Sequence, residues 1–486
     1  MIKDYLNFIE GLYTDVPPHL VPENGLYLMD NCEVSYKLGA ITKRCGYKNI
    51  GSALQTDKSI TGLFNFRQTA ATRKMLATVD DSTSDDTQLF YSTGGAWTEI
   101  ADAETAWANK AGINVEMESF IGYCFFVGYG ATDGFLPVGS LTNTTFSTST
   151  NVTNMPQAKY IKRYHDRLYV ANCYESATAY PFRVYFSSVP TAGSITWTVA
   201  SDFLDVDYSE EITGLGSNWD RLMIFTEYSA YMYDQQFFKK VWDVGCANHR
   251  TIKNSGAYMI WADMDGVWIS TSGRPENVSG RVKDFIHFSD MTSAFAEVVD
   301  EEYHLYIGSV TVNGVTYSNC DLILNLPTMS WRVAEYGDTP TIFAKYYASG
   351  QDHLWFGDSS GDVHELGKYT DSTILTSDDG APIHSWFQTS GFSLGAPSAV
   401  KRFNKIMTYA DRGQGLKLKA RVVDKNTQAL TPFAKLGDVT KYINEYQCNP
   451  DRGNFLQIEG VENGSLPYWS FYGFTADFEL DQPLKK

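Results

Sequence analysis

Alternating hydrophobic and polar positions between Gly256 and Gly273 predict a β-hairpin. Two short apolar runs, Ala257–Ala262 and Val267–Ser270, flank an Asp-Gly dipeptide at positions 265 and 266. This dipeptide tolerates the positive φ angles that a tight turn between antiparallel strands requires. We therefore expect two neighbouring strands of one antiparallel sheet.

The same apolar run, opened by a polar or small pair of residues, occurs seven times along the chain. The copies contain Met75, Cys124, Leu168, Leu222, Tyr258, Leu305 and Leu354, at spacings of 49, 44, 54, 36, 47 and 49 residues. A period in the forties with several short strands per unit is typical of propeller blades, whereas helical repeats show i, i+3, i+4 periodicity. The pattern predicts an all-β fold with a β-propeller of about seven blades between Ser59 and about Tyr369.

Further strands and a tryptophan recur within these units. A second strand follows in most copies, and in three of them it leads through a turn to Trp97, Trp197 or Trp331. The preceding, innermost strand also repeats, as ITGLFN from Ile60 and ITGLGSN from Ile212. We predict an outer strand that opens with an indole packed on the next blade.

Changes in pattern divide the chain into three parts. Residues 1–58 lack the repeat and are expected to form an extended N-terminal platform segment, followed by the propeller at 59–370. A polar stretch at 371–382 marks a boundary. Beyond it, at 383–486, longer alternating strands such as 416–424 and 454–462 predict a C-terminal β-sandwich that completes the platform.

Composition narrows the function. The chain has 486 residues and a net charge of −18, so its surface as a whole should repel nucleic-acid phosphates. No apolar run approaches membrane-spanning length, so we expect no membrane insertion. The 7 cysteines are scattered and odd in number, and no apolar leader follows Met1, which predicts reduced thiols and synthesis in the cytoplasm.

The N-terminal segment carries a recognisable order of residues. It contains Gly11-Leu12, Pro17-Pro18, Leu28, Asn31-Cys32-Glu33-Val34 and the run from Gly39 through Lys43-Arg44 to Gly46-Tyr47. This order resembles the start of tail nozzle proteins (also called hub or tail stabilisation proteins) of short-tailed bacteriophages. Residues 401–411 and 452–459 are similar to the C-terminal module of the same family. The resemblance covers both ends of the chain.

The resemblance implies a structural virion protein made in the host cytoplasm. Such proteins form a homohexameric ring below the portal and adaptor, surround the DNA exit channel and support tail fibres or spikes. DNA must pass without being held, because each phosphate bound by Lys or Arg adds affinity. We therefore expect acidic charge along the bore. The chain has three basic pairs, Lys43-Arg44, Lys239-Lys240 and Lys401-Arg402. We expect each to lie either at a contact with a neighbouring subunit or on ordinary solvated surface.

No residues form a recognisable catalytic, metal or cofactor motif, and we expect the protein not to be an enzyme. Asp263 and Asp265 suggest a calcium loop but lack its further ligands, so a plain turn is favoured. The acidic cluster at 80–86 is interpreted as a solvated loop. His304 and His353 occupy equivalent repeat positions, which favours a structural role over catalysis.

Two alternatives remain open. The stretch from Ser92 to Trp97 resembles the Ser-x-Asp-x-Gly-x-x-Trp box of sialidase-type glycosidases, but the aspartate is missing and the glycine is displaced. A host-surface, carbohydrate-binding propeller would use exposed aromatic rings for sugar stacking, and Tyr174 and Tyr180 are the candidates.

Overall fold

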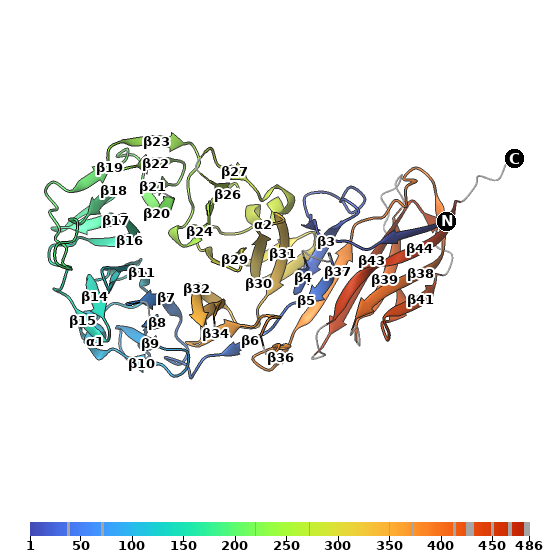
Figure 1. Cartoon of the computed structure of the whole chain (residues 1–486), viewed down its shortest axis with the longest axis horizontal. Coiled ribbons are helices and arrows are strands. Elements are labelled where there is room, and N and C mark those ends of the chain that lie inside the picture. The colour runs from blue at the N-terminus through green and yellow to red at the C-terminus, as the bar shows by residue number, and fades with distance from the viewer. Residues whose placement is uncertain are drawn as a thin grey trace.

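The computed structural model is an all-β protein with a β-propeller at one end and a second group of sheets at the other (Figure 1). It describes the whole chain except residues 36–38, 70–71, 219, 272, 349, 372, 412–414, 424–431, 449–451, 465–468 and 481–486. The predicted all-β propeller is confirmed at this level.

Six blades of the propeller are separate antiparallel sheets. Five have four strands and one has five. The chain runs outward from an innermost strand in each of them, except that the outermost strand of the last blade is β6 from the N-terminal segment. Their strands are β7 (Ile60–Arg67), β8 (Arg73–Asp80), β9 (Thr87–Ser92), β10 (Thr98–Glu99); β11 (Asn114–Phe120), β12 (Tyr123–Gly130), β13 (Gly134–Phe135), β14 (Gly139–Thr142), β15 (Thr145–Ser147); β16 (Gln157–Tyr164), β17 (Arg167–Glu175), β18 (Thr178–Phe186), β19 (Phe203–Asp205); β20 (Ile212–Asn218), β21 (Arg221–Thr226), β22 (Ala230–Tyr233), β23 (Phe238–Trp242); β24 (Lys253–Ser255), β25 (Tyr258–Ala262), β26 (Val267–Ser270), β27 (Glu276–Asn277); and β32 (Pro340–Ala348), β33 (Gln351–Asp358), β34 (Val363–Leu366), β6 (Tyr47–Asn49).

Four further strands lie between two of these blades, but they belong to a larger sheet. These strands are β28 (Phe295–Val299), β29 (Glu302–Val312), β30 (Val315–Asn325) and β31 (Ser330–Glu335). Strand β28 contacts β24 on one side and β32 on the other, and β32 contacts β7 to complete the circle. The ten-stranded sheet continues from β31 into the far end of the molecule. All seven predicted repeat strands are present, six in separate blades and one in this sheet.

The hairpin predicted from the alternating pattern is confirmed. Strands β25 and β26 pair in antiparallel register, with Ala262 opposite Val267. The Asp263 carboxylate accepts hydrogen bonds from the backbone N–H groups of Asp265 and Gly266, at 2.8 and 2.9 Å. Asp residues favour turns because their side chains can make such local bonds. The turn therefore accounts for these acidic residues without a bound ion.

Three repeated tryptophans each donate a hydrogen bond to the blade that precedes them in the ring. The Trp97 indole N–H donates to the carbonyl of Ile50, Trp197 to Asn151, and Trp331 to Val278. Each acceptor follows the outermost strand of the preceding blade. The expectation that the indole packs on the next blade is therefore wrong in direction. A buried indole N–H needs a hydrogen-bond acceptor. The carbonyl just past an outer strand takes no part in the hydrogen bonds between strands and can accept this bond.

The second group of sheets draws on both ends of the chain. A seven-stranded sheet runs β4-β5-β44-β38-β41, with β1 paired to β44 and β42 to β38, and the ten-stranded sheet continues β31-β2-β3-β37-β43-β39-β40. The strands are β1 (Ile2–Tyr5), β2 (Gly11–Leu12), β3 (Gly25–Asp30), β4 (Cys32–Val34), β5 (Ile41–Lys43), β37 (His384–Thr389), β38 (Lys401–Asp411), β39 (Lys417–Val423), β40 (Ala434–Asp438), β41 (Ile443–Gln447), β42 (Arg452–Gly453), β43 (Phe455–Asn463) and β44 (Ser470–Leu480). A small hairpin joins β35 (Ser377–Asp378) to β36 (Ala381–Pro382).

One continuous hydrophobic core joins these sheets to the neighbouring blades. It includes Phe8, Phe387 and Phe471 from the far end and Leu305 and Trp331 from the ring, all fully buried. Residues 1–58 do not form a separate body, because strands β1 to β5 join the far sheets while β6 completes the last blade. The two ends of the molecule therefore share both backbone pairing and a core.

Helices are few and short. They are α1 (Ala101–Ala106), α2 (Lys283–His287) and the 3₁₀ helices η1 (His249–Thr251) and η2 (Gly280–Val282). Within the described residues, none is long or apolar enough to cross a membrane.

Candidate functional site

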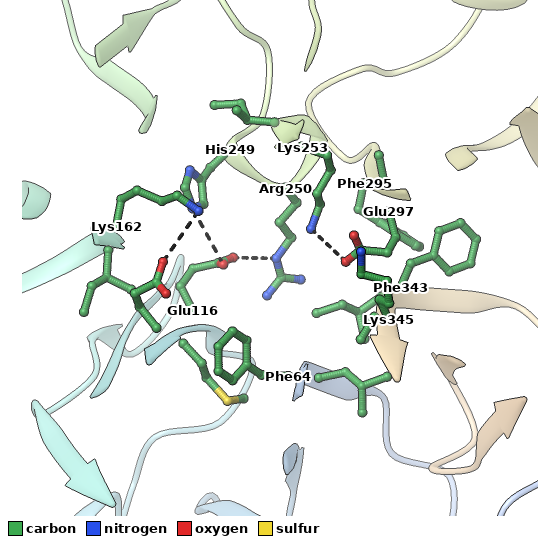
Figure 2. A pocket seen from close by; sticks show the side chains of 18 of the residues that line it. Phe64, Glu116, Lys162, His249, Arg250, Lys253, Phe295, Glu297, Phe343 and Lys345 are labelled. Carbon is green, nitrogen blue, oxygen red and sulfur yellow. Dashed lines mark hydrogen bonds and ion pairs between the residues drawn. The ribbon is translucent and has the colours of Figure 1, made fainter. Parts of the chain in front are cut away.

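The innermost strands surround a cavity of about 390 Å³ at the centre of the propeller (Figure 2). Strands β7, β11, β16, β20, β24, β28 and β32 all contribute to its wall, together with η1. Strand side chains alternate between faces, so every innermost strand presents some of its residues to this space. A ligand entering the propeller axis would meet these side chains.

Arg250 crosses the cavity and holds opposite sides together. It projects from η1, whose cap is Asn248, which accepts the backbone N–H of Arg250. The guanidinium donates to the Glu116 carboxylate at 2.7 Å and to the Thr61 carbonyl at 2.8 Å. These acceptors belong to β11 and β7, whereas η1 lies between β23 and β24. Arg250 therefore acts as a brace across the ring.

His249 and Glu116 have shifted pKa values that fit this brace. His249 Nδ1 accepts the backbone N–H of Leu215 at 3.1 Å, and burial lowers the pKa of His249 to about 4. Burial acts to raise the pKa of Glu116, but Arg250 and His249 outweigh it and lower that pKa overall. At neutral pH the site thus holds a neutral imidazole and an ionised carboxylate. Nδ1 is engaged by a backbone amide, so it is not available as a general base.

The other charges in the cavity are also paired. Lys162 lies 3.5 Å from Glu118, and Lys253 lies 3.3 Å from Glu297. Lys345 lies 3.7 Å from Asp352. The wall thus holds four cations and three carboxylates, and the fourth cation, Lys345, pairs with Asp352 outside the cavity. Such pairing favours a structural role over binding of a strongly charged ligand.

A second cluster lies where the propeller ring closes. His364 Nε2 lies 3.2 Å from Asp358 Oδ2 and 3.7 Å from Asp338 Oδ2, and Tyr47 of β6 donates its hydroxyl to Asp338. In the described part of the chain this is the one group of three such side chains close enough for a metal ion. Asp358 Oδ1 accepts two backbone N–H groups, from Ser360 and Asp362.

Hydrogen bonds account for this closing cluster. Asp358 is the last residue of β33 before the turn into β34, and Asp263 is the first residue of the turn between β25 and β26. The buried His364 completes the closing cluster by donating from Nε2, and this interaction helps lower the pKa of Asp358 against the opposing effect of burial. Sequence analysis missed the cluster, although the repeated turn aspartate was a visible signal.

The acidic and histidine candidates lie apart and serve local structure. Asp81 accepts hydroxyl hydrogen bonds from Thr83 and Ser84 in an exposed loop. The buried His304 lies 2.8 Å from Asp321 within one sheet. His353, in β33, is buried and lies 3.6 Å from Glu365. Within the described residues, Asp81, His304 and His353 do not line any of the five cavities described for this protein.

The structure also shows the surroundings of the residues that suggested a sialidase-type glycosidase or a carbohydrate-binding propeller. Ser92 Oγ accepts the backbone N–H groups of Gly94 and Gly95, so this hairpin is held by a local turn. Tyr174 is 37% exposed and stacks on Phe135 with ring centroids 5.5 Å apart. Tyr180 packs against the Arg183 guanidinium. Tyr174 and Tyr180 face different partners and do not form one aromatic platform.

The pair Lys43-Arg44 and the single residue Lys401 are buried, which corrects the expectation that they lie at the surface, whereas Arg402 is exposed. The Lys43 ammonium is buried at 2.8 Å from Glu462. The Lys401 ammonium is fully buried and donates to the carbonyls of Ala396, Ala399 and Asn454, while burial lowers the pKa of Lys401 to about 8. Lys239 and Lys240 are exposed on β23, so their role in a contact stays a prediction.

Arg44 forms the centre of a buried junction between the two ends of the molecule. Its guanidinium donates to both oxygens of Asp378, at 2.8 and 2.5 Å. It also donates to Asn31 Oδ1 at 2.5 Å and to the Glu335 carbonyl at 2.6 Å. Burial opposes this charge, but Asp378 raises the pKa of Arg44. Residues from β31, from the loop after β3 and from β35 therefore share one cation.

Glycines allow the chain to approach closely at the same junction. A Cβ at Gly46 would lie 1.9 Å from the Ser377 carbonyl oxygen, which is too close for any side chain. Gly11 has φ +67°, and a Cβ there would lie 2.6 Å from the Trp331 carbonyl oxygen. Only glycine fits such backbone contacts. Both positions are among those that carry the resemblance to tail nozzle proteins.

Comparison with known proteins identifies no family for this chain. No protein-family model matches the sequence, and no curated protein sequence matches it. Among solved structures, the Neurospora crassa Pan2 WD40 domain matches with 8% identity and a TM-score of 0.40, covering 68% of this chain and 98% of that one. YCF48 from Cyanidioschyzon merolae matches with 9% identity and a TM-score of 0.40, covering 66% and 98%. Similarity this low supports no functional argument.

Proposed function

We propose that the chain is a structural protein of a bacteriophage tail, of the nozzle type. In this proposal six copies form a ring around the DNA exit channel, below the portal and adaptor, and the ring supports fibres or spikes. The protein acts in the virion after synthesis in the host cytoplasm. It performs no catalysis and needs no cofactor.

The observation that carries this proposal is the buried junction at Arg44. Of the residues of the resemblance, Asn31 and Arg44 belong to this junction, where Arg44 also reaches the Glu335 carbonyl of β31, and Gly46 lies against Ser377 beside it. Lys43 pairs with Glu462 within the far sheets. A subunit of a load-bearing ring benefits from two parts that cannot move independently, because contacts between copies then fix both at once.

The closed centre of the propeller suggests where DNA would pass. Arg250 and its partners cross the propeller axis, and the cavity there is only about 390 Å³. A duplex could not enter it. We infer that the channel lies between the subunits, on the common axis of the ring, and that each propeller forms part of its wall or rim.

Two finer features of the fold belong to the same proposal. We count β28–β31 as a seventh blade, since β28 takes an innermost place between β24 and β32. We also interpret the two far sheets as a β-sandwich, because their buried faces share the core that includes Phe387 and Phe471. In this view the sandwich is the platform and the propeller projects from it.

A carbohydrate-binding propeller is the second candidate. Tyr174 and Glu175 line an open pocket of about 530 Å³, and Tyr174 is 37% exposed. An exposed ring beside a carboxylate can stack on a sugar and accept its hydroxyl groups. Binding of host glycans that is lost in Tyr174→Ala would favour this candidate.

The mass and the bore of the assembled protein test the tail proposal. In native mass spectrometry of the isolated tail, or of this protein after assembly with tail components, we expect a particle of six chains of 54.4 kDa each. Electron microscopy of the virion should show a six-fold ring whose bore is acidic, in keeping with a charge of −18 on each chain. A monomer or dimer in the virion would refute the ring, and a bore lined mainly by Lys and Arg would refute the channel.

A further inference from the structure

A groove between two neighbouring blades has an unusual lining. It holds about 600 Å³ and lies between the blade β20–β23 and the blade β24–β27. Its walls come from the connections β19–β20 and β23–β24 and from the turns β21–β22 and β25–β26. In an antiparallel blade, alternate connections lie at the same edge, so all four are on one face of the propeller.

The groove is strongly acidic. Its lining includes six carboxylates and, among the described residues, no Lys, Arg or His. The carboxylates are Glu210, Glu211, Glu227, Asp243, Asp263 and Asp265. Only two have a cation within 4.0 Å in the described structure: Glu211 with Lys159, and Asp243 with Lys240. Among the described residues, the other four carboxylates have no cation within this distance.

Apolar surface lies beside these carboxylates. Tyr228 is 70% exposed and Met264 is 50% exposed, and both line the groove together with the half-buried Trp268. Asp263 is 7% exposed, and burial raises its pKa. A large exposed tyrosine and methionine at the edge of one cavity are typical of a contact surface rather than of solvated surface.

We propose that this groove binds a Lys- or Arg-bearing extended segment of a partner protein. Lys and Arg side chains have an apolar stem and a charged head. The stems would lie on Met264, Tyr228 and Trp268, and the heads would reach Glu227, Asp265 and Asp263. The Tyr228 and Trp268 rings can also attract a cation through their faces. The inference goes beyond the tail proposal and does not depend on it.

Peptide binding to the full chain tests the proposal. The probe is a fluorescent synthetic peptide of alternating Lys and Ser, and its control carries citrulline-like neutral side chains in place of Lys. We expect fluorescence anisotropy to show binding of the Lys peptide only, weakening as salt is raised. In Glu227→Gln with Asp265→Asn, the affinity should fall at least about tenfold, and Tyr228→Ala should weaken it as well.

A matched variant separates specific binding from the general effect of an acidic chain. Asp166→Asn with Asp220→Asn removes the same number of charges from turns at the opposite edge of the blades. This variant should bind the Lys peptide as the wild type does. Equal losses in both double variants, no loss in either, or displacement by a free polyamine as tightly as by the peptide would overturn the proposal.

Discussion

At the residue scale, the charged side chains show where sequence reasoning succeeds and fails. Asp263 was correctly predicted as a turn residue, because its hydrogen bonds reach only two and three positions along the chain. Lys43 was wrongly predicted to lie on the surface, because its partner Glu462 is 419 positions away. Local chemistry is visible in a sequence, whereas a buried ion pair depends on folding that brings distant segments together.

His249 gives a pH-dependent prediction. Burial lowers its pKa from about 6.5 to about 4, so the unfolded chain binds this proton at a higher pH than the folded chain. The unfolded state therefore carries more protons between pH 6.5 and pH 4, and the free energy of unfolding falls as the pH falls through this range. Above pH 6.5 the His249 imidazole is neutral, and its Nδ1 accepts the hydrogen bond from the Leu215 backbone N–H. The stabilisation by neutral His249 is therefore retained above this pH.

The expected change in the free energy of unfolding follows from the difference between the pKa of His249 in the folded and unfolded states. Between pH 7 and pH 4.5 the loss of unfolding free energy should be about 2 kcal/mol larger in the wild type than in His249→Gln. Urea unfolding at the two pH values measures both losses, and the difference removes the contribution of the other titrating groups. Equal losses in the two proteins would contradict the assignment.

At the element scale, strands were predictable and their assembly into sheets was only partly so. The apolar runs containing Met75, Leu222 and Leu354 all fall on the second strand of a blade. The sequence contained no sign that β31 would pair with β2 and so continue the strands β28–β31 into a ten-stranded sheet. Two residues form β2, and pairing that short depends on the packing around it rather than on its own pattern.

The indole ties between blades provide a prediction at this scale. Trp331 is fully buried and donates to the Val278 carbonyl of the preceding blade at 2.9 Å. Trp331→Phe keeps most of the apolar contact but leaves the carbonyl without its donor, so unfolding should become easier by about 1 kcal/mol. Trp331→Ala also creates a cavity and should cost about 3–5 kcal/mol.

Chemical denaturation of the two Trp331 variants measures these costs. Trp97→Phe is the matched comparison, because Trp97 makes the same kind of bond, to Ile50, at a half-buried position. Its effect should be smaller than that of Trp331→Phe, since water can reach the freed carbonyl. A larger effect at Trp97 would show that the tie does not depend on burial.

At the scale of the whole molecule, the junction at Arg44 decides whether the two ends behave as one body. Arg44 and Asp378 are 3% and 7% exposed at their side chains, and Asp30 lies in the same buried region with a pKa raised by burial and by Glu335. The sequence showed only a basic turn here. Its role became visible once residues 30–46, 335 and 378 were brought together.

Removing the Arg44 guanidinium should therefore lower the free energy of unfolding substantially. Arg44→Ala leaves Asp378 buried without its partner, and we expect a loss of about 3–5 kcal/mol in the free energy of unfolding. The double variant Arg44→Met with Asp378→Leu replaces the pair by apolar groups of similar size and should recover much of that loss, because it leaves no unpaired charge. Arg402, an exposed arginine on β38, supplies the control: Arg402→Ala should change stability by less than about 0.5 kcal/mol.

The same variants test rigidity separately from stability. If the buried pair locks the two ends, small-angle scattering of folded Arg44→Ala should show a wider distribution of overall dimensions than the wild type, whereas Arg402→Ala should match the wild type. If Arg44→Ala is less stable but scatters like the wild type, the shared core that includes Leu305, Phe387 and Trp331 is enough to hold the ends together. In that case the ion pair contributes to folding but not to the joint, and the structural argument for a load-bearing subunit loses its main support.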